Sequence, residues 1–91
     1  MFAITNSKGF HMTFANDWTV SVQWGPGNYC ENYSEPFTTM PADWISKTAE
    51  VWAWHESANG KRDCYATENP LAYQSPDEVA RFIAEVAARP H

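Results

Sequence analysis

The sequence lacks any apolar run near the ~20 residues that a membrane-spanning helix requires. Its first residues contain neither the basic region nor the apolar block of a secretory signal, so we expect a cytoplasmic protein. Basic side chains are scarce, with six Lys and Arg against eleven Asp and Glu and a formal net charge of −5. This balance disfavours the phosphate attraction behind duplex nucleic-acid binding and suits a basic partner. We therefore predict neither a membrane nor duplex nucleic acid as a partner.

Cysteine is also rare, and its spacing matches no metal or redox motif. Cys30 and Cys64 are far apart in the chain, so in a reducing compartment we expect two thiols. A zinc site would need both to converge with His11 and His55, without any closely spaced pair among the four ligands. The sequence therefore predicts no metal and no cofactor.

Two segments near the N-terminus, 10–14 and 18–24, show the alternation of apolar and polar residues that is typical of half-buried strands. A two-residue turn between them would place the apolar side chains on opposite faces. A three-residue loop keeps Phe14 opposite Trp18 and puts Asp17 in the left-handed position. We therefore predict a hairpin with the longer loop.

A second hairpin is predicted over 49–66, with Asn59-Gly60 as the two central residues of its turn. Trp54 then lies opposite Tyr65, and His55 lies opposite Cys64. The last pair could supply a base and a thiolate nucleophile, but no orienting third group or oxyanion site is identifiable. A buried His beside a small apolar Cys is the commoner situation. We predict that the protein is not an enzyme.

The clearest element is a helix over 76–89, preceded by Ser75 as N-cap with Pro at the first helical position and Glu three residues after the cap. Between the hairpins, residues 31–47 show no sustained period and are predicted to form a long connection with a short helical turn at 42–45. The predicted fold is a single α+β domain, 1–91. In it, an antiparallel sheet of four or five strands, from hairpins 10–24 and 49–66, carries the C-terminal helix on one face.

The segments KGFHMTFANDWTVSVQWGPGNYC, SKTAEVWAWHE and SPDEVARFIAEVA resemble small proteins encoded by bacteriophages and related mobile elements. That family carries no agreed activity, so the resemblance implies an accessory protein of the host cytoplasm and indicates no catalytic residue. Proteins of this size and origin often counter bacterial immunity by trapping a nucleotide signal or by blocking an effector protein.

Aromatic residues are abundant, because five Trp, four Tyr and five Phe make up 15% of the chain. A small domain has a thin core, and each large ring buries about 150–250 Å². We therefore expect some rings at an interface or in a pocket, and a homo-oligomer with Trp52 or Trp54 near the subunit contact. Two arrangements of the strand 49–56 are open: Trp52 and Trp54 face away from the helix, or they point into the core.

The segment GPGNYCENY, residues 25–33, is the strongest candidate for a binding loop. Gly25 and Gly27 permit positive φ and could turn backbone amides outward to hold an anion, although Gly-Pro-Gly also simply ends a strand. Nearby rings could stack a base. The predicted ligand-binding residues are Trp24, Asn28, Tyr29, Tyr33, Trp52 and Trp54.

These features predict a binding protein that sequesters a small nucleotide-like immune signal and so helps a phage to evade host defence. The alternative is a protein–protein inhibitor that blocks a host defence complex through an acidic and aromatic surface.

Overall fold

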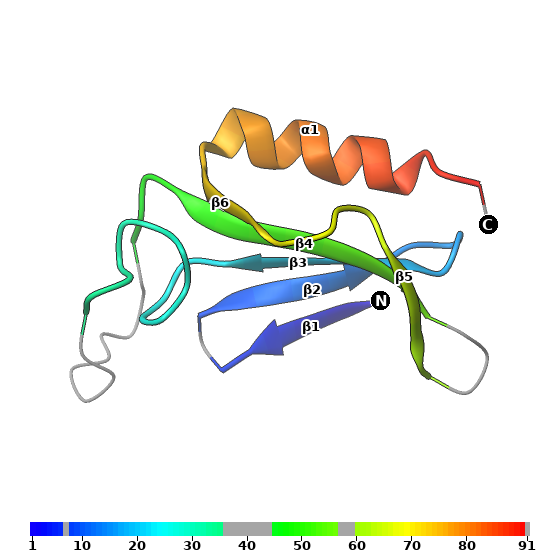
Figure 1. Ribbon diagram of the computed structural model, residues 1–91, viewed down its shortest axis with the longest axis horizontal. Coiled ribbons are helices and arrows are strands. Elements are labelled where there is room, and N and C mark those ends of the chain that lie inside the picture. The colour runs from blue at the N-terminus through cyan, green and yellow to red at the C-terminus, as the bar shows by residue number, and fades with distance from the viewer. Residues whose placement is uncertain (7, 36–44, 57–59, 91) are drawn as a thin grey trace.

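The computed structural model describes residues 1–6, 8–35, 45–56 and 60–90, in which six strands form one antiparallel sheet with a helix across one face (Figure 1). The sheet order is β1-β2-β3-β4-β5, and β6 pairs with β4. This confirms the predicted α+β fold. The elements are β1 (Phe2–Thr5), β2 (Gly9–Thr13), β3 (Trp18–Gln23), β4 (Ala49–Glu56), β5 (Arg62–Tyr65), β6 (Leu71–Gln74) and α1 (Pro76–Ala87).

The hairpin of β2 and β3 has the predicted register. The amide of Phe14 donates to the carbonyl of Trp18 at 2.9 Å, and Asp17 has a φ of 66°. The side-chain oxygen of Asn16 accepts the amide of Trp18 at 3.0 Å, which holds the loop in shape. The three-residue loop is thus confirmed, and the apolar residues of both strands share the face that meets the helix.

The hairpin of β4 and β5 also has the predicted pairs, Trp54 with Tyr65 and His55 with Cys64, followed by a bulge after His55. The predicted turn residue Asn59 and residues 42–44 of the predicted helical turn lie outside the described residues. Strands β1 and β6 were not predicted. Each has only four residues, and β6 pairs with β4 through an irregular register, so neither shows a sustained alternation.

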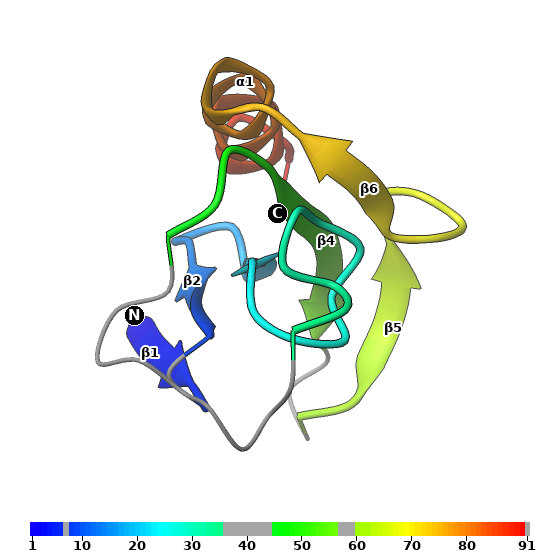
Figure 2. The same ribbon diagram turned by 90° about the vertical axis from the view of Figure 1, so that its left-hand side faces the viewer.

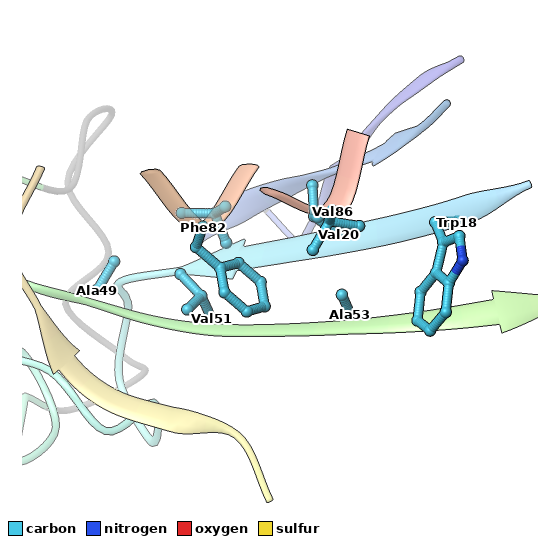
Figure 3. Close-up of a cluster of buried hydrophobic side chains, with 8 residues drawn as sticks. Trp18, Val20, Ala49, Val51, Ala53, Phe82 and Val86 are labelled. Carbon is cyan, nitrogen blue, oxygen red and sulfur yellow. The ribbon is translucent and has the colours of Figure 1, made fainter. Parts of the chain in front are cut away.

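Helix α1 packs on β3 and β4, where the side chains beneath it are small (Figure 3). Val20, Val51 and Ala53 are fully buried and leave room for Phe82 and Val86 to reach the sheet. Because a strand alternates its side chains between two faces, the small residues of β4 face the helix and its tryptophans face away. The first of the two predicted arrangements is therefore the observed one.

Both ends of α1 are fixed by side-chain hydrogen bonds. At its start, the hydroxyl of Ser75 accepts the amide of Glu78 at 3.2 Å, and the Glu78 carboxylate accepts the amide of Ser75 at 2.9 Å. The bond from the Ser75 amide to its carboxylate is the main cause that lowers the pKa of Glu78. At its end, Asn16 donates to the carbonyls of Val86 and Arg89 at 3.0 and 2.9 Å, which satisfies groups that have no partner within a helix. The hairpin loop therefore serves as a C-terminal cap for the helix.

Gly9 is required by the close approach of two strands. A Cβ added there would lie 2.0 Å from the carbonyl oxygen of Val22, which cannot move without disturbing the pairing of β3. We expect Gly9→Ala to lower the free energy of unfolding by about 3 kcal/mol, measured by urea denaturation. The control is Gly60→Ala, where φ is 80° but the added Cβ meets nothing within 4 Å, so that the loss should be about 1 kcal/mol. Equal losses in the two variants would show that the strand contact is not the cause.

Candidate functional site

The loop 25–35 uses its own backbone amides for internal hydrogen bonds. Gly25 donates to the side-chain oxygen of Asn28 at 3.1 Å, and Gly27 donates to the carbonyl of Tyr33 at 3.1 Å. The amide of Asn28 donates to the carbonyl of Gly25 at 3.2 Å. Gly27 has the expected positive φ of 80°, but the prediction that these amides turn outward to hold an anion is wrong. Asn28 therefore shapes the loop through its oxygen.

Asn32 attaches this loop to the end of the sheet. Its side-chain nitrogen donates to the carbonyls of Trp24 and Ile45 at 2.7 and 3.1 Å, and the residue is buried. Glu31 adds a second link, because its carboxylate accepts the amide of Lys47 at 2.6 Å. Figure 2 shows the loop in front of the sheet, close to the start of β4. A segment that was predicted as a free binding loop is thus fastened to the chain before β4.

Three half-exposed tyrosines lie in this loop or are bonded to it. We call Tyr29, Tyr33 and Tyr73 the tyrosine cluster. The rings of Tyr29 and Tyr33 stack face to face, with centroids 5.3 Å apart and an interplanar angle of 5°. The amide of Tyr73, in β6, donates to the carbonyl of Tyr29 at 2.9 Å. Their exposed fractions are 50%, 46% and 54%. The cluster therefore combines a stacked pair of rings with a third exposed tyrosine from a separate segment, joined to the pair through its backbone.

Tyr73 was not predicted as a site residue, and its backbone is unusual. Its φ of 53° lies in the left-handed region, which costs a non-glycine residue about 1 kcal/mol or more. Backbone strain of this kind is concentrated at functional sites. Because the conformation depends on a hydrogen bond to a residue 44 positions earlier, no local sequence signal could have indicated it.

The surroundings of the tyrosine cluster are acidic. The carboxylate of Glu50 accepts the amide of Tyr29 at 3.2 Å, and the Glu31 carboxylate lies against the next segment. Loop 25–35 contains no Lys or Arg of its own, but the ammonium of Lys8 donates to the carbonyl of Pro26 at 3.4 Å. A phosphate placed against Tyr29 would meet the negative charge of the Glu50 carboxylate, whereas a positively charged group would be attracted there.

A cavity of about 360 Å³ lies at the same end of the molecule, on the helix side of the sheet. Trp24 forms part of its wall, and its ring contacts Phe10 edge-on at 6.1 Å between centroids. Val22, Ala49 and Val79 make the remaining wall largely apolar, and Lys47 also lines the cavity. The volume falls within the range of small-molecule sites.

The predicted residues Trp52 and Trp54 lie on the sheet face away from the helix. Trp54 is buried, with the guanidinium of Arg62 3.9 Å from its ring centroid and its ring nitrogen donating to Glu56 at 2.9 Å. Trp52 is half-buried and stacks on Tyr65 at 4.3 Å. Trp54 is therefore covered by its own chain and offers little surface to a ligand or subunit.

The structure brings Tyr29 and Tyr33 together, but it places Trp24 on the other side of the sheet from Trp52 and Trp54.

Within the described ranges, no three His, Cys, Asp or Glu side chains are placed to hold a metal, and no helix is long and apolar enough to cross a bilayer. Comparison with known protein families, characterised proteins and solved structures finds no match.

The side chains of Asn28 and Asn32 should respond differently to replacement by Asp. Asn32 uses its nitrogen toward two carbonyls, so Asn32→Asp would bury a carboxylate against acceptors and should cost about 3 kcal/mol of unfolding free energy. Asn28 uses its oxygen, which an aspartate also supplies, so Asn28→Asp should cost less than about 1 kcal/mol. Urea denaturation of both variants measures the difference. Similar losses would contradict the assigned roles.

His11 provides a pH-dependent contribution to stability. Its ring contacts Trp54 edge-on at 5.2 Å, and burial, followed by the charge of Arg62, lowers its pKa below 6.5 against the opposing effect of Glu56. Below pH 6.5 the unfolded chain therefore binds more protons at this residue, and the free energy of unfolding falls as the pH drops through the folded pKa. We expect His11→Gln to lose less stability than wild type between about pH 7.5 and pH 5.5. An unchanged pH dependence would show that His11 does not titrate as described.

Proposed function

We propose that this chain is a non-enzymatic binding protein of phage type that blocks a host defence protein through the tyrosine cluster. The observation that carries the proposal is that the half-exposed rings of Tyr29 and Tyr33 stack on each other, while the backbone of Tyr29 is bonded to the Glu50 carboxylate and to Tyr73 in β6. The phage setting rests on the resemblance of the sequence to small phage proteins. The proposed partner presents a basic surface.

Tyrosine is well suited to such contact because it combines a large apolar ring with a polar hydroxyl and has few rotatable bonds. The stacking of Tyr29 on Tyr33 keeps both rings in place before a partner arrives, which reduces the entropy lost on binding. Exposed aromatic anchors of this kind provide much of the binding energy in protein interfaces. The cluster is therefore prepared for binding in the free protein.

Charge supports a basic partner. The net charge of −5, together with Glu31 and Glu50 beside the cluster, attracts a positively charged surface and repels a phosphate. Electrostatic attraction between such surfaces raises the association rate and weakens as salt is added. For this reason a protein partner is a better candidate for the tyrosine cluster than a nucleotide.

Sequestration of a nucleotide-like ligand is the second candidate, and one observation favours it. The cavity beside Trp24 is large enough for an aromatic base, and Lys47 offers a positive charge for a phosphate. A nucleotide at 100 times its Kd should stabilise the protein by about 2.7 kcal/mol in a thermal-shift screen. Lys47→Ala should reduce this effect and Lys61→Ala should not, and no shift with any cyclic or linear nucleotide would reject this candidate.

The main proposal is tested by expressing the protein in bacteria that carry single defence systems and then measuring phage plating. Where wild type restores plating, the protein should retain the effector of that system on purification. Tyr29→Ser combined with Tyr33→Ser should weaken this complex at least 30-fold, corresponding to about 2 kcal/mol, and abolish the restored plating.

The matched control is Tyr65→Ser, which removes a half-exposed tyrosine on β5 outside the cluster. It should leave both plating and complex formation unchanged. A complex that is equally sensitive to both variants, or that survives loss of both cluster rings, would reject the tyrosine cluster as the binding surface. Circular dichroism would show that each variant is folded.

A further inference from the structure

Strand β1 lies at the edge of the sheet and exposes large apolar side chains. The exposed fractions of Met1, Phe2 and Ile4 are 83%, 77% and 83%. An edge strand presents unpaired backbone groups that another strand can join, and natural proteins usually protect such an edge with charge, proline or a bulge. The sequence of β1, FAIT, contains none of these residues, and its pairing with β2 is regular.

The hydrogen bonds of β1 determine which backbone groups point outward. The terminal ammonium of Met1 donates to the carbonyl of Thr13, and the amide of Thr13 donates to the carbonyl of Met1, each at 2.8 Å. In an antiparallel pair such bonded positions alternate along the strand, so Ala3 also turns its amide and carbonyl toward β2. Phe2 and Ile4 then direct their amides and carbonyls away from the sheet.

The side chains of Phe2 and Ile4 lie on the helix side of the sheet. They pair with Met12 and Phe10, two half-buried residues that pack against the core. Helix α1 contacts β3 and β4, and Figure 1 shows β1 at the edge of the sheet farthest from α1. This part of the apolar face is therefore left without a covering element among the described residues.

On the other side of the sheet, β5 and β6 both pair with β4. Strand β5 is exposed, carries Arg62 and Asp63, and follows a bulge in its pairing with β4. These features oppose the addition of another strand. The edge at β5 is therefore protected, and β6 donates its Tyr73 amide to loop 25–35, whereas β1 has no such protection.

We propose that β1 is the contact through which two copies of this chain form a symmetric dimer. The two β1 strands run antiparallel about a twofold axis at Ala3, so that Phe2 of one copy lies opposite Ile4 of the other. This register uses every outward-facing amide and carbonyl of Phe2 and Ile4 in four hydrogen bonds. It also joins the two sheets into one and places four apolar side chains together on the same face.

The available area suits a reversible dimer. Met1, Phe2 and Ile4 together leave roughly 400–500 Å² in water, compared with about 800 Å² per partner in a standard stable interface. Phe10 and Met12, which are half-buried, and the strand backbone add to this area. We expect dissociation in the micromolar range. Because each copy carries a charge of −5 and β1 carries no charged side chain, added salt should strengthen the dimer.

Analytical ultracentrifugation of the protein without an N-terminal tag gives the first test. Wild type should change from monomer to dimer between about 1 and 100 µM. Ile4→Lys should weaken the dimer at least 30-fold and Ile4→Val less than threefold, while both should remain folded because the side chain is exposed. A monomer at 100 µM, or a dimer that is unaffected by Ile4→Lys, would overturn the proposal.

Cross-linking tests the register. In the proposed register, Ala3 of one copy lies opposite Ala3 of the other as a non-hydrogen-bonded pair. The Cα atoms of such a pair lie about 4.5 Å apart, which is within the range of a disulfide. Ala3→Cys combined with Cys64→Ser should form a covalent dimer under mild oxidation. Wild type is the control, because its exposed Cys64 on β5 can form disulfides only when molecules collide at random. It should form at least tenfold less covalent dimer. Equal cross-linking in the two proteins would overturn the proposed register.

Discussion

The structure depends on a helix that lies directly on two central strands, and this requires small side chains beneath it. Val20, Val51 and Ala53 are fully buried at that contact. A larger residue at Ala53 would lift α1 from the sheet and move its last turn away from Asn16. Because side chains alternate on a strand, confining small residues to one face of β4 places Trp52 and Trp54 on the other. The helix contact therefore determines on which face the two tryptophans of β4 are found.

Much of the fold could be predicted from local patterns. The register of β2 and β3 followed from the alternation of apolar residues and the loop around Asp17, and α1 followed from the capping sequence at Ser75. Strands β1 and β6 could not be predicted, because four residues are too few to show a period and their conformation depends on pairing with distant segments. The left-handed backbone of Tyr73 is likewise set by a long-range hydrogen bond.

The candidate site was predicted less well, for a physical reason. Asn28 was expected to bind a ligand, but, like Asn32 and Glu31, it holds the loop together through a hydrogen bond to backbone. A side-chain amide or carboxylate can serve a ligand or its own chain equally well, and only the positions of the backbone partners decide between them. The rings of Tyr29 and Tyr33, by contrast, contact each other and remain half-exposed.

Asn16 has one more consequence, which concerns the synthesis of the chain. It joins the first long hairpin to the carbonyl of Val86, 70 residues later, so the sheet cannot receive its helix until nearly all of the described chain has left the ribosome. Until then, the apolar face of β3 and β4 has no cover, and a nascent chain in this state is open to aggregation or chaperone binding. Long-range closure of this kind also slows folding, since loop entropy is lost before the contact forms. The hydrogen bonds that cap the helix thus form only when the apolar face of the nascent chain becomes covered and its exposure to aggregation ends.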